Sequence, residues 1–199
     1  MQIGFIGVGA MGGGLARNLI RAGKSVLIYD INAATVEKTL AAGTSGKAVQ
    51  NAADLAGCDL VFTSLPLPAH LQETMLGDAG LLAKMSPGAV YIDVSTIDPG
   101  TARELQAAAK KKGIGFLECP LGKTPAQAET AEEPIFVGGD ETVYQKVKDI
   151  LEIIGNPVTY LGTVDAACAV KLISNLIGMT NLAVLAEGIR IGEAAGLDK

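Results

Sequence analysis

Aromatic and histidine side chains are scarce in this sequence. It has no tryptophan, four tyrosines, four phenylalanines and a single histidine, His70, among 199 residues. So few rings provide no platform on which nucleic-acid bases could stack. Positive charge is also in short supply, because 16 lysines and arginines stand against 21 aspartates and glutamates, a net charge of −5. Nucleic acids and anionic membrane surfaces are therefore not expected as partners.

Cysteine is equally sparse. Cys58, Cys119 and Cys168 are scattered without a CxxC or other metal-ligand spacing, so no metal site is expected. An odd number of dispersed thiols is typical of a reducing compartment and predicts a cytoplasmic location. The chain opens directly on MQIGFIG without the features of a signal peptide, and no uncharged apolar run reaches the length of a membrane span.

Short apolar runs alternate with segments of helical periodicity, and 49% of the residues are hydrophobic. The runs that predict strands lie at 3–7, 25–30, 47–50, 59–66, 88–95, 113–120, 134–139 and 157–162. Helical patterns lie at 10–23, 33–42, 101–112 and 140–154. Continuous apolar strands that alternate with helices predict an α/β fold with a doubly wound, mostly parallel sheet covered on both faces.

The first predicted strand runs into a glycine-rich turn. Gly7, Gly9 and Gly12 form the pattern G-x-G-x-x-G. The first glycine allows a tight turn, the second leaves room for a diphosphate against the backbone, and the third lets the helix pack close to the strand. The diphosphate would then lie on free N–H groups at the positive end of the helix dipole. A tight βαβ unit that binds no ligand would use the same glycines.

An acid follows at the end of the second predicted strand. Asp30 stands where a carboxylate would accept hydrogen bonds from the 2′- and 3′-hydroxyls of a ribose. This order of strand, glycines, helix, strand and acid predicts a Rossmann-type dinucleotide-binding domain over residues 1–163. Ile31 comes next and the nearest following basic residue is Lys38, so no cation waits for a 2′-phosphate. NAD is therefore favoured over NADP as the cofactor.

Four segments resemble the β-hydroxyacid dehydrogenase family, the group of 3-hydroxyisobutyrate dehydrogenase. They are GFIGVGAMGGGLARNLIRAGKSVLIYD at 4–30, DVSTIDPGTAREL at 93–105, KLISN at 171–175 and AEGIRIGEAAGLD at 186–198. The resemblance implies an NAD-dependent oxidoreductase that interconverts a small β-hydroxyacid and its aldehyde or ketone by hydride transfer. It also implies that 164–199 form a long interdomain helix, and that the all-α C-terminal domain which follows it in the family is absent from this chain.

Lys171 and Asn175 lie in the most apolar third of the chain, where Lys171 is the only charge between Asp165 and Glu187. Residues four apart share one face of a helix, so both side chains can point into one cleft. A lysine whose pKa is lowered by apolar surroundings can give or take a proton, and the asparagine can hold the ammonium or the substrate. On periodicity alone, Lys171 could equally reach solvent or pair with Asp165 or Glu187.

Two further strand ends contribute polar groups or cofactor contacts. Ser95 and Thr96 follow a strand at the carboxyl edge of the sheet, where open α/β sheets bind ligands. Their hydroxyls and N–H groups suit a substrate carboxylate and the nicotinamide side, although they would also suit the N-cap of the next helix. The resemblance assigns Leu65 and Pro66 to cofactor contact. It places His70 near the adenosine side of the cofactor, away from the reacting carbon.

The segment Gly122-Lys123-Thr124 departs from the family, much of which has Ser-Gly-Gly there. A lysine adds a full positive charge and three donors, which favours a second anionic group on the substrate, such as a carboxylate, phosphonate or sulfonate. The sulfolactaldehyde reductases of the family resemble this stretch with Gly-Arg-Thr. A solvated loop lysine is the alternative.

The expected site residues are Lys171 and Asn175 for catalysis; Gly7, Val8, Gly9, Ala10, Met11, Gly12, Asp30, Ile31, Leu65, Pro66 and Thr96 for the cofactor; and Ser95, Gly122, Lys123 and Thr124 for the substrate. The expected ligand is a small anionic hydroxyacid or aldehyde. Because residues 165–195 are apolar on nearly every face, we also expect a homo-oligomer through this helix and the missing domain. A non-catalytic dinucleotide-binding module and a decarboxylating enzyme like 6-phosphogluconate dehydrogenase remain alternatives.

Overall fold

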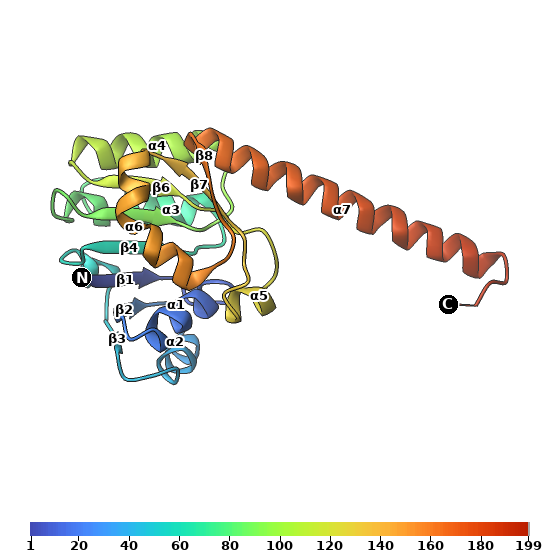
Figure 1. The fold of residues 1–199 in the computed structure, drawn as a ribbon, viewed down its shortest axis with the longest axis horizontal. Coiled ribbons are helices and arrows are strands. Elements are labelled where there is room, and N and C mark those ends of the chain that lie inside the picture. The colour runs from blue at the N-terminus through green and yellow to red at the C-terminus, as the bar shows by residue number, and fades with distance from the viewer. Residues whose placement is uncertain (199) are drawn as a thin grey trace.

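The centre of the molecule is an eight-stranded sheet in the order β3-β2-β1-β4-β5-β6-β7-β8, seen in a computed structural model that describes residues 1–198 (Figure 1). The strands are β1 (Gln2–Ile6), β2 (Ser25–Tyr29), β3 (Gly46–Ala48), β4 (Leu60–Thr63), β5 (Val90–Asp93), β6 (Gly115–Glu118), β7 (Ile135–Gly139) and β8 (Val158–Gly162). The helices are α1 (Gly12–Arg21), α2 (Ala33–Leu40), α3 (Pro68–Met75), α4 (Pro99–Lys111), α5 (Pro125–Glu129), α6 (Glu141–Ile154) and α7 (Val164–Ala194), with 3-10 turns η1 (Ala52–Leu55) and η2 (Leu81–Ala83).

Strand direction confirms the predicted doubly wound, mostly parallel sheet. All pairs from β3 to β6 are parallel. β7 pairs antiparallel to β6, and β8 pairs parallel to β7. The last two strands therefore run against the rest, and the carboxyl ends of β1, β2, β4 and β5 gather at one edge of the sheet.

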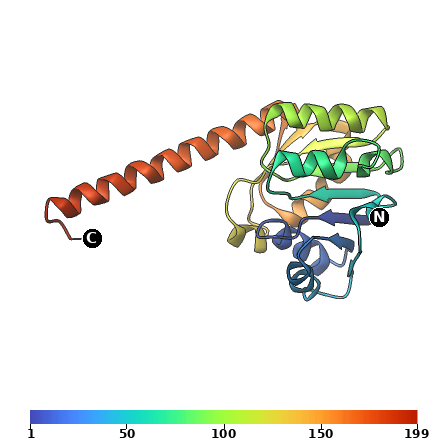
Figure 2. The same cartoon turned by 180° about the vertical axis from the view of Figure 1, so that it is seen from behind.

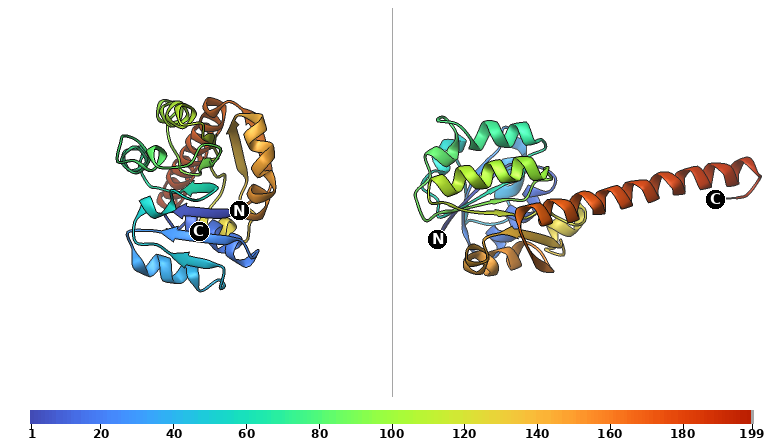
Figure 3. Two further views of the ribbon diagram at one scale, coloured as in Figure 1. Left: turned by 90° about the vertical axis from the view of Figure 1, so that its left-hand side faces the viewer. Right: turned by 90° about the horizontal axis from the view of Figure 1, so that it is seen from above.

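Two layers of helices cover the sheet (Figure 3). One apolar core lies between the sheet and α1, α2 and α6; the other lies under α3, α4 and the first turns of α7. Phe5 stacks on Phe62 in the first core at 5.3 Å between ring centroids, and Tyr91 contacts Phe116 in the second at 5.1 Å. Both faces of the central strands are thus buried, which explains why those strands read as unbroken apolar runs.

The start of α4 differs from one predicted alternative. Its N-cap is Asp98, whose side chain accepts a hydrogen bond from the Thr101 N–H at 3.0 Å. Ser95 and Thr96 do not cap this helix, and both line the cleft at the sheet edge. The short helix α3 was not predicted; it begins at Pro68, the first-turn position where proline's missing N–H costs no hydrogen bond.

Helix α7 has few residues that pack against the rest of the molecule. Of its 31 residues only Val164, Ala167 and Cys168 are buried, and the rest of the helix projects from the sheet into open space (Figures 1 and 2). Its large exposed apolar side chains are Leu172, Ile173, Leu176, Ile177, Met179, Leu182, Val184, Leu185, Ile189 and Ile191. By length and composition alone it could also cross a membrane, but one helix that passes this test is weak evidence.

Candidate active site

A cleft of about 1020 Å³ lies at the carboxyl edge of the sheet. It brings together most of the predicted site residues: Gly7, Gly9, Ala10, Met11, Gly12, Asp30, Ile31, Leu65, Pro66, Ser95, Thr96, Lys123 and Lys171. His70 and Leu121 line it as well. Four predicted residues are not part of its wall: Val8, Gly122, Thr124 and Asn175.

The glycine turn has the shape that a diphosphate needs. A Cβ on Gly12 would lie 2.1 Å from the Gly7 carbonyl oxygen, so this glycine is required by the packing of α1 against β1. A Cβ on Gly9 would meet no protein atom within 4 Å, although Gly9 lines the cleft. Within residues 1–198 the N–H groups of Ala10, Met11 and Gly12 donate to no protein acceptor. Open space and free donors at a helix start fit an anionic diphosphate.

Asp30 sits beside this turn and shapes it. Its Oδ2 accepts a hydrogen bond from the Val8 N–H at 2.7 Å, and its Oδ1 accepts one from the Asn32 N–H at 2.8 Å. Val8 thus contributes through its backbone without lining the cleft. Each carboxylate oxygen keeps a free acceptor position for a ribose hydroxyl. Ile31 next to it is 93% exposed, and of the lysines and arginines in residues 1–198 only Lys123 and Lys171 line the cleft.

A buried carboxylate that the sequence did not single out holds Ser95. Asp93 ends β5 and its Oδ1 accepts from the Ser95 hydroxyl at 2.7 Å and from the Thr63 hydroxyl at 2.6 Å. The Ser95 oxygen in turn accepts from the Leu65 N–H at 3.0 Å. Burial raises the pKa of Asp93 to about 6, against the opposing effect of the two hydroxyl donors. This chain of bonds joins two strand ends to the floor of the cleft.

Glu118 adds a second buried acid next to Asp93. The two residues are direct partners in the β5–β6 register, and both are fully buried. Within residues 1–198, neither carboxylate oxygen of Glu118 has a hydrogen-bond partner. Burial, and then the charge of Asp93, raise the pKa of Glu118 well above its usual value. Both causes disfavour the charged form of Glu118, because two adjacent charges here would repel one another without solvent.

Lys171 enters the cleft from the second turn of α7 and is half-buried. Burial lowers the pKa of its amine, and the carboxylate of Glu133 raises it in opposition. Asn175 lies one turn further along, where α7 has left the sheet, and is exposed. Helical phase puts both residues on one side of α7, but only Lys171 reaches the cleft.

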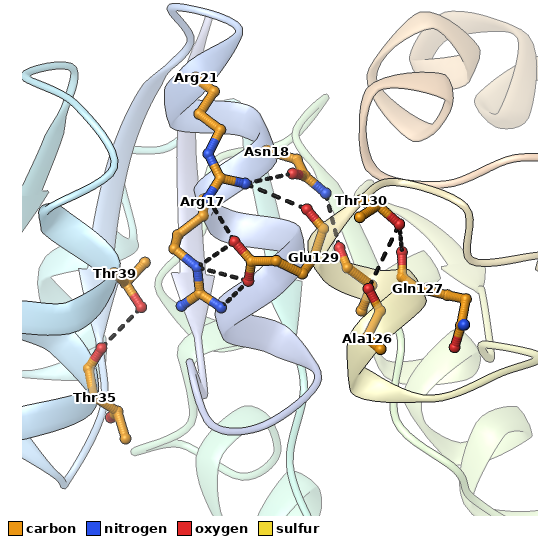
Figure 4. Close-up of polar contacts among 10 residues, drawn as sticks. Arg17, Asn18, Arg21, Thr35, Thr39, Ala126, Gln127, Glu129 and Thr130 are labelled. Atoms are coloured by element: carbon orange, nitrogen blue, oxygen red, sulfur yellow. Dashed lines mark hydrogen bonds and ion pairs between the residues drawn. The ribbon is translucent and has the colours of Figure 1, made fainter.

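The loop that carries Lys123 is fastened to the dinucleotide helix. Arg17 of α1 binds Glu129 of α5 through its Nε at 2.9 Å, and Arg21 binds the same carboxylate (Figure 4). The Asn18 amide donates to the Ala128 carbonyl at 2.8 Å. Arg17 lowers the pKa of Glu129, with help from Arg21, to about 2. One wall of the cleft is thereby tied to the other.

Comparison with known proteins agrees with the fold. Residues 2–162 match the family described as the NAD binding domain of 6-phosphogluconate dehydrogenase. Fold and site are those of a domain that binds a nicotinamide dinucleotide. The chain belongs to the β-hydroxyacid dehydrogenase family, as the resemblance of its four segments implied.

Three relatives illustrate the similarity. The chain is 34% identical over 197 residues to the 2-(hydroxymethyl)glutarate dehydrogenase of Eubacterium barkeri, which covers 99% of this chain and 65% of that protein. It is also 34% identical to the mitochondrial 3-hydroxyisobutyrate dehydrogenase of Bos taurus, over 98% of this chain and 58% of that one. The structure of Mycobacterium tuberculosis 3-hydroxyisobutyrate dehydrogenase with L-serine superimposes with a TM-score of 0.88 at 28% identity, covering 99% and 66%. The chain thus spans about two thirds or less of these relatives.

Proposed function

We propose that the protein is an NAD-dependent β-hydroxyacid dehydrogenase, which interconverts a small β-hydroxyacid or related anionic alcohol with its aldehyde or ketone. One observation supports this most directly: the half-buried amine of Lys171 lines the same cleft as the glycine turn and Ser95-Thr96. A proton-transfer group, a dinucleotide cradle and anion-binding hydroxyls therefore share one space.

The residues of the chain would divide the chemistry as follows. The nicotinamide, when bound, supplies or accepts the hydride at the substrate carbon. Lys171 as the ammonium gives its proton to the carbonyl oxygen during reduction and is left as the amine; in oxidation the amine takes the hydroxyl proton. Thr96 would hold the carboxylate through its hydroxyl and N–H groups. Ser95 would join it only by releasing Asp93, to which its hydroxyl and N–H both donate. Asn175 would hold the ammonium or the substrate hydroxyl. It is exposed outside the cleft, so this role would require its side chain to move toward the cleft.

Lys123 favours a substrate with a second anionic group. It lines the cleft, as Lys171 does. Its charge would bind a carboxylate, phosphonate or sulfonate at the end remote from the reacting carbon. The likeness to a 2-(hydroxymethyl)glutarate dehydrogenase, named for a dicarboxylate, supports this choice. Gly122 and Thr124 would act by shaping the loop, since neither lines the cleft.

NAD is proposed as the preferred form of the dinucleotide. The carboxylate of Asp30 would accept hydrogen bonds from ribose hydroxyls and repel a 2′-phosphate. Of the lysines and arginines in residues 1–198, only Lys123 and Lys171 line the cleft, and both stand on the substrate side. The same scarcity of cations speaks against a phosphorylated sugar acid as in 6-phosphogluconate dehydrogenase.

The alternative of a binding module without turnover has no specific observation in its favour. A homo-oligomer that covers the exposed face of α7, and a cytoplasmic location, belong to the same proposal. The deciding experiment is a panel of hydroxyacids and aldehydes, with one or two carboxylates, phosphonates or sulfonates, assayed for change in NADH absorbance with the purified protein. Tight NAD binding without turnover on the whole panel would favour the binding module instead.

A further inference from the structure

Glu133 lies behind the two lysines of the cleft and is fully buried, whereas its neighbour Glu132 is exposed. It stands just before β7, on the segment that faces the Lys123 loop. An ionisable side chain is rarely buried to this degree unless something pairs with it. Its surroundings therefore indicate what it does.

One oxygen of Glu133 fixes the loop. Oε1 accepts a hydrogen bond from the backbone N–H of Lys123. The adjoining Gly122 N–H donates to the Pro134 carbonyl at 2.9 Å, and an antiparallel bridge joins Leu121 to Ile135. The segment before β7 thus holds the backbone of Lys123 in place, so that its side chain lines the cleft.

The other oxygen of Glu133 has no donor. Oε2 is buried and has no hydrogen-bond partner in the part of the chain that the structure describes. Burial raises the pKa of Glu133, and the Lys123 N–H and then the charge of Lys171 oppose that rise. Glu133 is the one charged group in residues 1–198 that shifts the pKa of Lys171, which it raises. No ion pair within 4.0 Å joins the two side chains, so Lys171 affects Glu133 through its charge and not through a direct contact.

We propose that Glu133 is a positioning residue for Lys171: its free Oε2 receives the ammonium and holds it at the cleft wall, while Oε1 fixes the backbone of Lys123. This inference rests on the proposed function, because it assigns the lysine a proton to deliver. After a reduction leaves Lys171 as the amine, the amine takes a proton from solvent, and the carboxylate of Glu133 favours the ammonium that forms. The carboxylate of Glu133 and the two ammonium groups of Lys123 and Lys171 together carry one net positive charge. This net charge would attract the second anionic group of a substrate and still allow the product to dissociate.

The first test requires no turnover. The protein is trace-labelled with acetic anhydride at a series of pH values, and the fraction of Lys171 acetylated is measured by mass spectrometry. In Glu133→Gln, which keeps an acceptor for the Lys123 N–H but removes the charge, we expect the labelling midpoint of Lys171 to move to lower pH. The matched control Glu132→Gln should leave it unchanged. An unchanged midpoint in a Glu133→Gln protein with a native circular dichroism spectrum would overturn the proposal.

The second test uses turnover. Glu133→Gln should lower kcat roughly 10- to 100-fold, the cost of a misplaced catalytic group, with the Kd for NAD unchanged. The basic limb of the pH profile should move in the same direction as the labelling midpoint. Glu133→Asp keeps the charge but withdraws it by one methylene. Its kcat and its labelling midpoint should lie between those of the wild type and those of Glu133→Gln. If Glu133→Gln does not fold, the Glu133→Asp variant decides. A kcat and a labelling midpoint equal to those of the wild type would then refute the proposal. A wild-type protein without turnover refutes the proposed function alone, because the labelling result still decides the role of Glu133.

Discussion

Arg17 of the dinucleotide helix and Glu129 of the substrate-side loop form an ion pair across 112 residues of sequence (Figure 4). The guanidinium is largely enclosed, with 12% of its side chain exposed, whereas the carboxylate is 37% exposed. Gly14 of α1 allows this contact, because a Cβ there would lie 2.8 Å from the Ala128 backbone. The loop that carries Lys123 is therefore anchored on the helix that begins the diphosphate cradle.

Breaking this pair should loosen the loop without unfolding the sheet. In a double-mutant cycle of Arg17→Met and Glu129→Gln, we expect a coupling of about 1 kcal/mol at pH 7, reduced by the exposure of the carboxylate. Because the pKa of Glu129 is lowered to about 2 from 4.5, the stabilisation is present above pH 4.5 and is lost as pH falls toward 2. Urea unfolding of the four proteins across this range measures it. Additive effects at every pH would argue against the pair.

Two glycines of the turn should respond in opposite ways to alanine. Gly9→Ala places a methyl group in open space, so the free energy of unfolding should stay within about 1 kcal/mol of wild type, while the Kd for NAD rises roughly tenfold or more. Gly12→Ala drives its Cβ against the Gly7 carbonyl and should cost at least about 2 kcal/mol. Chemical denaturation and calorimetry separate the two effects. If NAD binds Gly9→Ala normally, the cradle is misassigned.

Cofactor choice should turn on one exposed side chain. Ile31→Arg adds a cation beside the ribose position without disturbing any packing, since Ile31 is 93% exposed. A charge-assisted hydrogen bond contributes about 1.5–3 kcal/mol, so the ratio of NADP to NAD affinity should rise roughly tenfold or more. Asp30→Ala in the same protein should raise it further. Calorimetric titration with both dinucleotides is the measurement, and a wild type that prefers NADP would contradict the assignment.

Lys171 should be needed for chemistry and not for cofactor binding. Lys171→Ala is expected to lower kcat on the order of 10²–10⁴-fold, the usual effect of removing a general acid–base group. Lys171→Arg should be nearly as slow, because a guanidinium cannot give up its proton. Lys148→Ala, on the exposed face of α6, is the control. Asn175→Ala should have a milder effect, and a fully active Lys171→Ala would make the lysine structural.

The buried acid Asp93 should leave a mark on stability of the opposite sign to Glu129. Its pKa rises from 3.8 to about 6 on folding, so the native state binds more protons than the unfolded state between these values. The contribution of Asp93 to the free energy of unfolding is therefore largest below pH 3.8. It falls as pH rises through 6, by up to about 3 kcal/mol. Asp93→Asn, which keeps an acceptor for Ser95, should remove that slope. The free energy of unfolding is measured with urea against pH for both proteins. If the curves of the wild type and Asp93→Asn run parallel, the prediction for Asp93 is refuted.

Sequence reasoning recovered the parts of the molecule that depend on local rules. Doubly buried strands need apolar runs, and the diphosphate turn needs glycine at fixed positions, so both could be read directly. Contacts between distant segments could not. Asp93 looked like a strand residue preceding Ser95, and nothing in the order of residues brought Glu133 to Lys123. The exposure of Asn175 depends on where α7 leaves the sheet, which helical periodicity alone does not state.

Helix α7 is, in mechanical terms, a beam clamped at one end. β7 and β8 run against the other strands, and the helix that follows β8 starts beside the sheet and then leaves it (Figure 1). Val164, Ala167 and Cys168 form the clamp, and Lys171 stands on the next turn. The far end at Ala194 lies about 35 Å beyond Lys171 along the axis. Deflection of a clamped beam grows steeply with distance from the support. Bending of α7 would therefore change the distance between Lys171 and the glycine turn very little. It would displace the residues of the outer turns much more.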